Sequence, residues 1–127
     1  MIRFYKNYFV NEDERGRFVG LINDKNWQEI NYFHTKENQI RANHYHKHTD
    51  ELFIILEGKI KITLTKVLPN GKLDKKSSDY SITKNDVFVI EKMTYHTFEI
   101  IEESTWINAL TIKMDNDNPD IISIQNL

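Results

Sequence analysis

Hydrophobic and polar residues alternate with a period of two along most of the chain. The clearest stretch is Lys59–Lys66. There, Ile60, Ile62 and Leu64 share one parity, and polar residues hold most of the other. Because successive side chains of a β-strand point to opposite faces, this pattern predicts a strand with one buried face. Comparable stretches predict further strands at Ile30–Phe33, Ile40–His46, Leu52–Leu56, Tyr80–Ile82, Val87–Ile90, Thr97–Ile101 and Thr105–Ile112.

Short polar segments separate these predicted strands. We expect turns at Lys47–Asp50, Glu57–Gly58, Pro69–Gly71, Lys84–Asp86 and Glu102–Ser104. Strands that follow one another without helical patterns between them predict an antiparallel sandwich or barrel. Helix is expected at most as one turn near Asp24–Gln28 and another after Pro119.

Length and composition indicate one folded domain. The chain has 127 residues and a mass of 15.2 kDa, with 39% hydrophobic and 28% charged residues. This size suffices for one hydrophobic core but not for two, so we expect a single domain spanning residues 1–127. The alternation places in that core Phe53, Ile55, Ile60, Ile62, Leu64, Val87, Val89 and Trp106.

Charge and cysteine content narrow the possible partners. A net charge of −2 creates no field that would attract nucleic acid or an anionic membrane, and neither is expected as a partner. Residues 1–20 carry many charges and no long apolar run, so we expect no signal peptide, no transmembrane span and a cytoplasmic location. Because the chain has no cysteine, any metal must be held by His, Asp or Glu.

Three of the five histidines fall within positions 44 to 48. His44 and His46 are two residues apart on a predicted strand, so both imidazoles project from one face. A hairpin through Lys47–Asp50 would return Glu51 beside them. Two imidazoles and a carboxylate suit a divalent first-row metal such as Zn, Fe, Mn or Ni, and His96, just before another strand, is the candidate for a fourth ligand.

The spacing of these residues resembles the first motif of the cupin family: His44-x-His46, four residues, Glu51, six residues, Gly58. The second cupin motif is also in register, with His96 eleven residues after Asn85. The resemblance implies an all-β, single-domain cupin fold, which is a double-stranded β-helix or jelly-roll barrel. It also implies a metal held by His44, His46, Glu51 and His96.

The chain departs from the cupin pattern at a few positions. Asn38 and Asn85 stand where the motifs open with Gly, and asparagine tolerates the left-handed backbone of a tight turn. Glu91–Met93 replaces the usual Pro-x-Gly, so the loop that presents His96 is expected to differ in shape.

Other segments resemble sugar-nucleotide cupins. Asp13–Phe18 is similar to the Asp-x-Arg-Gly-x-Phe segment of deoxysugar epimerases, and Arg41–Lys47 to the Arg-Gly-x-His-x-His-Lys stretch of sugar-nucleotide 3,4-ketoisomerases, with Ala42 in place of Gly. Asn31–Lys36 resembles the ketoisomerase strand that carries a functional tyrosine. Asp117–Asp120 resembles the ending of capsular-polysaccharide sugar reductases. The resemblance implies an isomerase or epimerase of a nucleotide-linked keto-deoxysugar in surface polysaccharide biosynthesis.

The residue types fit such chemistry. Proton abstraction beside a ketone needs a base, which His44 or His46 could supply, and Tyr32 could return the second proton. Arg41 could hold the developing oxygen anion or the nucleotide diphosphate. A metal-bound His44 cannot also be a free base. Either a metal organises the site and Tyr32, His34 or Tyr95 moves protons, or the site is metal-free and the two histidines do so.

Two other classes remain open. The same four residues could hold Fe(II) in an oxygenase, and a cupin barrel can also bind a small molecule without catalysis. Glu51 favours a metal over the metal-free alternative, since metal-free ketoisomerases tend to lack an acidic residue at that place.

A homodimer is also expected. The N-terminal stretch is apolar and strand-like, and a small barrel would struggle to cover it alone. Exchange of terminal strands is common in the sugar cupins that the chain resembles. The residues concerned are Ile2, Phe4, Tyr5, Tyr8, Phe9 and Val10.

Overall fold

Two long antiparallel strands, β6 (Glu51–Val67) and β9 (Thr94–Leu110), pair with each other along almost their whole length and form the frame of the fold. The structure is a computed structural model that describes residues 1–123. Its other strands are β1 (Ile2–Phe4), β2 (Phe9–Asp13), β3 (Gly16–Gly20), β4 (Glu29–Thr35), β5 (Ile40–His44), β7 (Leu73–Thr83) and β8 (Val87–Ile90).

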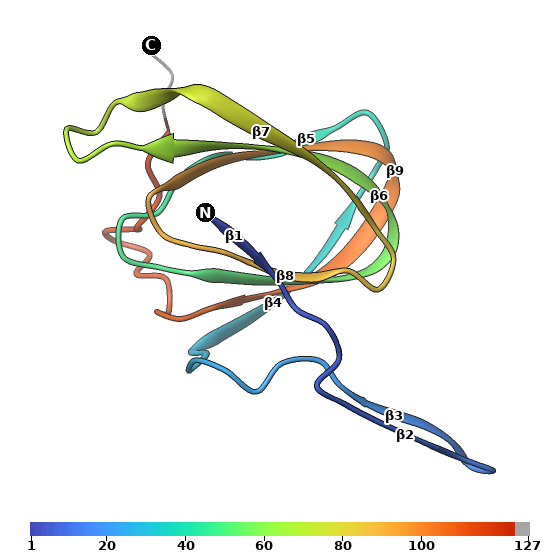
Figure 1. The fold of residues 1–127 in the computed structure, drawn as a ribbon. Helices are drawn as coiled ribbons and strands as arrows, with labels where there is room; N and C mark the ends of the chain where they lie inside the picture. Colours follow the sequence, from blue (N-terminus) through green and yellow to red (C-terminus); the bar gives the residue numbers. More distant parts are fainter. Residues whose placement is uncertain (124–127) are drawn as a thin grey trace.

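The shorter strands extend the frame on both sides. β6 pairs with β8 through its first residues and with β7 through its last, while β9 pairs with β5 near its start and with β4 near its end. All of these pairs are antiparallel, and Figure 1 shows the long strands curving around one side of the barrel. The fold is therefore the all-β jelly-roll barrel that the cupin resemblance implied.

Two of the predicted turns are wrong. Glu57–Gly58 lies inside β6 and Glu102–Ser104 lies inside β9, so each of these long strands replaces two predicted ones. The pairing register shifts around Gly58, whose φ is +108°, and such bulges bend a strand without ending it. The pattern of turn-forming residues is the same for a bend and for a chain reversal.

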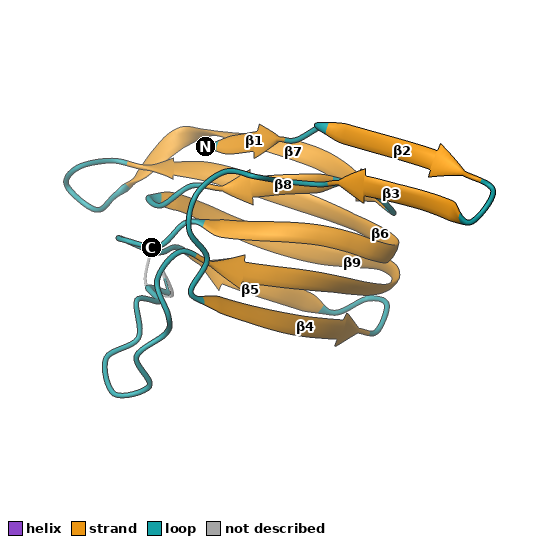
Figure 2. Ribbon diagram, turned by 90° about the horizontal axis from the view of Figure 1, so that it is seen from below, coloured by secondary structure: helices purple, strands orange, loops and turns teal. Residues whose placement is uncertain are grey.

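Neither of the two helical turns that the sequence allowed, near Asp24–Gln28 and after Pro119, is present among residues 1–123. Among residues 1–123 the structure has strands, bends and turns but no helix (Figure 2). Accordingly, no described residue belongs to a helix that could cross a membrane. The predicted turns at Pro69–Gly71 and Lys84–Asp86 are confirmed as the connections that flank β7.

The positions at which asparagine replaces the cupin glycine behave as expected. Asn38 has a φ of +64° and Asn85 a φ of +76°, both in the left-handed region. Asparagine adopts this backbone more readily than most other non-glycine residues, so the turns form without glycine.

The predicted core is confirmed, because all eight of its residues are buried. Most of them fill the barrel interior, where Phe53, Phe98 and Trp106 lie among aliphatic side chains. Val87 and Val89 instead belong to a second cluster, in which residues of the N-terminal half pack against β8. β8 is therefore buried on both faces.

The β2–β3 hairpin lies outside the barrel. It forms a two-stranded sheet of its own and projects away from the rest of the chain (Figure 1). Its apolar side chains, including Phe9 and Phe18, are exposed and contact each other edge to face. The predicted apolar N-terminus thus divides between β1, which pairs with β8, and this projecting arm.

The bend at Gly58 predicts a strong effect of added bulk. A Cβ at Gly58 would lie 2.0 Å from Ser104 Oγ and 2.6 Å from Ser104 Cα, so Gly58→Ala should lower the free energy of unfolding by roughly 3 kcal/mol. Gly71→Ala is the matched control, because its φ is +83° but nothing lies within 4 Å of the added carbon. It should cost about 1 kcal/mol in urea unfolding. Equal losses in the two variants would show that β9 does not restrict Gly58.

Candidate functional site

A bulge in β5 turns His44 into the barrel. Arg41 pairs with Phe98, and His44 pairs with His96. His44 follows Arg41 by three positions along β5, whereas only two positions separate their partners along β9. Ala42 and Asn43, with φ values of +66° and +63°, accommodate the extra residue. Because directly opposed residues share a face, Arg41 and His44 both lie on the side of the buried Phe98 and His96.

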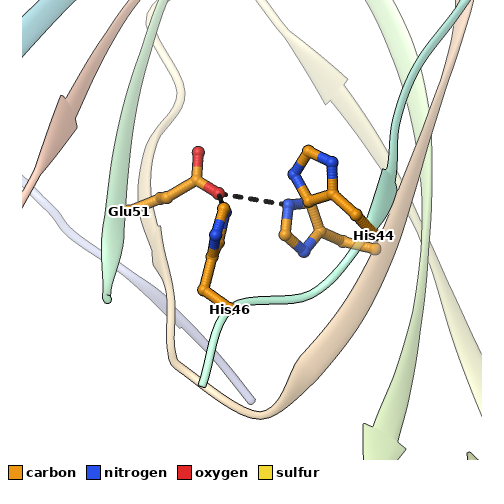
Figure 3. A group of neighbouring side chains, drawn as sticks. His44, His46 and Glu51 are labelled. Carbon is orange, nitrogen blue, oxygen red and sulfur yellow. Dashed lines mark hydrogen bonds and ion pairs between the residues drawn. The ribbon is translucent and has the colours of Figure 1, made fainter. Parts of the chain in front are cut away.

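The structure brings together the four residues of the expected ligand set. His44, His46, Glu51 and His96 each offer one ligand atom, and these atoms lie within 4.8 Å of one another. In Figure 3 the side chains of His44, His46 and Glu51 point toward one another. His46 lies beyond the end of β5, so its convergence with His44 does not come from strand alternation as predicted.

The hydrogen bonds of the imidazoles orient their second nitrogens toward Glu51. His96 Nδ1 lies 2.9 Å from the carbonyl oxygen of Thr94, and His46 Nδ1 bonds to the carbonyl oxygen of Asp120. A carbonyl only accepts, so both Nδ1 atoms carry the proton. In the neutral rings, both Nε2 atoms therefore carry a lone pair.

These lone pairs meet one carboxylate oxygen. His46 Nε2 contacts Glu51 Oε1, and His96 Nε2 lies 3.3 Å from the same oxygen. His96 Nε2 is buried and has no hydrogen-bond partner among the described residues. Facing acceptors repel each other unless a proton or a metal ion lies between them, so this donor set fits a divalent cation.

The electrostatics of the cluster favour a positive charge beside Glu51, which either a proton on His46 or a metal ion can supply. Burial and the neighbouring His96 and His46 lower the pKa of His44 to about 4, so His44 is neutral at pH 7. Burial alone would raise the pKa of Glu51, but the bond with His46 and the nearby imidazole of His96 lower it below its usual range. Burial tends to lower the pKa of His46, and the bond to Glu51 outweighs this and raises it. The carboxylate is thus ionised, as metal binding requires.

Asn108 holds the other oxygen of Glu51 and was missed from the sequence. Its Nδ2 donates to Glu51 Oε2 at 2.8 Å, and its Oδ1 accepts from Asn31 Nδ2 at 3.1 Å. Asn31 Nδ2 also lies 2.9 Å from Glu29 Oε2. The available signal was the position of Asn108, which shares the parity of the buried Trp106 and is itself buried.

Arg41 is exposed and lies close to the cluster in sequence, and its side chain packs against residues of β4. Its Nε donates to Thr35 Oγ1 at 3.0 Å, and its guanidinium carbon lies 5.5 Å from the centre of the Phe33 ring. Phe33 in turn stacks on Trp106 with ring centres 5.2 Å apart. This packing gives the guanidinium a defined orientation.

The other residues considered for proton transfer lie apart from the cluster. Tyr32 is 67% exposed and alternates with inward-facing residues of β4, so within one copy of the chain it points away from the barrel interior. His34 is on the same outer face and pairs with Glu103. The hydroxyl of Tyr95 donates to Asn43, and His48 is exposed.

Solved structures with the same fold include a 3,4-ketoisomerase, a dTDP-4-dehydrorhamnose 3,5-epimerase and a capsular polysaccharide assembling protein. A 3,4-ketoisomerase from Helicobacter canadensis superposes with a TM-score of 0.75 at 16% identity, covering 97% of this chain and 90% of that one. The dTDP-4-dehydrorhamnose 3,5-epimerase from Elizabethkingia anophelis NUHP1 gives 0.75 at 17% identity, covering 98% and 81%.

The capsular polysaccharide assembling protein CapF from Staphylococcus aureus gives a TM-score of 0.68 at 23% identity, covering 91% of this chain and 32% of that one. At these identities the likeness shows the shared cupin fold. No curated protein sequence matches the chain.

A family model covers most of the chain. It is the model described as polysaccharide biosynthesis C-terminal domain, and it matches residues 11–122. This range contains the whole His and Glu cluster, the bulge of β5 and the segment that carries Asp120. The chain therefore belongs to the polysaccharide biosynthesis C-terminal domain family.

Proposed function

We propose that the chain is a metal-binding isomerase or epimerase that acts on a nucleotide-linked keto-deoxysugar in surface polysaccharide biosynthesis. The single observation that carries the proposal is the cluster of three imidazoles and a carboxylate inside the barrel. The family description and the sugar-nucleotide isomerases and epimerase among its structural neighbours support the substrate class. A buried group of mutually perturbed titratable residues is typical of a functional site.

In this proposal His44, His46, Glu51 and His96 hold the metal, whose identity among Zn, Fe, Mn and Ni is left to experiment. When bound, the metal would supply positive charge that stabilises negative charge developing on the substrate carbonyl oxygen. Arg41 binds the nucleotide diphosphate or the same oxygen, because a guanidinium forms paired hydrogen bonds with such anions.

If the site works without a metal, His44 and His46 move the protons. His44 is neutral at pH 7, because burial and the neighbouring His96 and His46 lower its pKa to about 4, and its side chain is only partly buried. The same nitrogen cannot bind a metal and accept a proton at once. Metal analysis therefore separates the two roles.

Metal content is the first prediction. Protein purified without a His tag should contain about one divalent metal ion per chain, and the His44→Ala, His46→Ala double variant should contain almost none. The His34→Ala, His48→Ala double variant is the control, because both side chains are exposed and outside the cluster. Elemental analysis of the three proteins measures the difference. Equal metal content in all three proteins would contradict the proposed metal site.

Proton exchange with solvent is the second prediction. In deuterated water the protein should introduce deuterium at the carbon beside the ketone of a nucleoside-diphosphate 4-keto-6-deoxyhexose, because proton abstraction precedes every product of this class. Mass spectrometry of the recovered sugar measures the incorporation. His46→Ala should mainly slow this exchange. Arg41→Ala should mainly weaken substrate binding, by about 10- to 100-fold for the loss of hydrogen bonds to a charged group.

The same measurement separates the alternative functions. A panel of 4-keto sugar nucleotides that shows neither binding nor deuterium uptake, in protein that retains its metal, would contradict the sugar chemistry. Iron in the purified protein together with oxygen uptake would then indicate an oxygenase. Metal without any turnover would indicate a binding protein.

We further propose that the protein is a homodimer that covers the β2–β3 hairpin. A two-stranded sheet is only marginally stable alone in water, and this one exposes several apolar side chains. The side chains concerned are Tyr8, Phe9, Val10 and Phe18.

Light scattering at micromolar concentration tests the dimer. The wild type should have twice the mass of the 15.2 kDa chain, and Phe18→Glu should shift it to the monomer, because a charge would be buried in the contact. Ile112→Glu makes the same change at an exposed apolar residue outside the hairpin and should leave the dimer intact. A monomeric wild type would contradict the proposal.

A further inference from the structure

The C-terminal segment returns to the loop that carries His46. Ile122 and Tyr45 form an antiparallel bridge, with backbone hydrogen bonds of 3.0 and 2.9 Å in the two directions. Tyr45 lies between His44 and His46 and is itself buried. Residues 111–122 therefore form a strap that runs from the end of β9 to the site.

Asp120 is the main polar anchor of this strap. Its Oδ1 accepts from the backbone N–H of Lys47 at 2.9 Å. Its Oδ2 accepts from the backbone N–H of His48 at 2.8 Å and from the hydroxyl of the buried Thr49 at 2.9 Å. Burial alone would raise the pKa of Asp120, but these donors lower it, so the anchor stays ionised at neutral pH. One carboxylate thus binds three consecutive residues of the loop between His46 and Glu51.

The backbone of the same residue contacts the site directly. The carbonyl oxygen of Asp120 accepts a hydrogen bond from His46 Nδ1, across 74 positions of sequence. Asp117, three residues earlier on the strap, forms no side-chain hydrogen bond or ion pair with this loop within residues 1–123. Asp120 therefore binds the loop through its carboxylate and the His46 imidazole through its backbone carbonyl.

We propose that Asp120 is a positioning residue for the metal site. Its carboxylate holds the loop between His46 and Glu51, and its carbonyl keeps the His46 proton on Nδ1, so that Nε2 faces Glu51. The partner of the second imidazole nitrogen commonly sets the tautomer and ring orientation of a metal-binding histidine. The effect of Asp120 on metal affinity rests on the proposed metal site, whereas its hydrogen bond to the His46 imidazole does not.

The experiment compares Asp120→Ala and Asp120→Asn with the wild type, and Asp117→Ala serves as the control on the same strap. In metal-free protein, NMR detects the proton on His46 Nδ1 and its exchange with water. Asp120→Ala should lose the protection of this proton, and Asp120→Asn should keep part of it, because an amide oxygen can still accept from the loop. Asp117→Ala should match the wild type.

Zinc binding is measured on the same proteins by competition with a chelator. Asp120→Ala should bind Zn²⁺ roughly 10- to 100-fold more weakly, as is typical when an outer-shell partner of a metal ligand is lost. Asp120→Asn should fall between Asp120→Ala and the wild type. Circular dichroism of each variant records whether the barrel is folded.

The outcomes distinguish the positioning of His46 by Asp120 from the binding of a metal. Unchanged proton protection and unchanged zinc affinity in folded Asp120→Ala would overturn the proposal. Equal losses in Asp120→Ala and Asp117→Ala would also overturn it, because the strap as a whole would then be responsible. If the wild type binds no Zn²⁺, the metal site fails, and proton protection alone decides whether Asp120 holds the ring.

Discussion

The closure of the β6–β9 ribbon into a barrel is the constraint on which the site depends. Glu51 pairs with Leu110, whereas His96 pairs with Leu64, thirteen residues further along β6. In a straight ribbon this separation would be about 40 Å. In the folded chain His96 Nε2 lies 3.3 Å from Glu51 Oε1. The bend at Gly58 and Ser104, where no side chain fits between the strands, contributes to this closure.

The barrel interior combines an apolar core with a polar cluster that stability alone would not favour. Burying an ionised carboxylate costs several kcal/mol unless partners satisfy its oxygens, and buried ion pairs rarely gain more than apolar packing would. Here His46 and His96 face one oxygen of Glu51, and Asn108 donates to the other. An arrangement that is costly to bury and held from several sides is typical of a site retained for function.

The fold is shared with enzymes to which the chain is only 16 to 17% identical. Such a likeness follows from the strand pattern and the core, which many sequences satisfy, so it specifies the barrel and leaves the reaction open. What distinguishes this chain lies at particular residues. Ala42, for example, occupies a left-handed position where the related motif has glycine.

The sequence by itself determined the features that depend on local geometry. Alternation identified the core residues, such as Ile60 and Trp106, because successive side chains of a strand point to opposite faces of the sheet. The spacing around His44, Glu51 and His96 identified the residues that converge. Asparagine at positions 38 and 85 indicated left-handed turns, since that preference belongs to the residue itself.

The tertiary structure decided everything that depends on the path of the sheet. Whether Gly58 reverses the chain or bends it depends on the strand that packs against it, and whether Tyr32 faces in or out depends on which side of β4 the barrel closes. Asn108 and Asp120 reach the site from 57 and 74 positions away. No local pattern encodes such contacts, because they form only when the closed barrel brings distant backbone segments together.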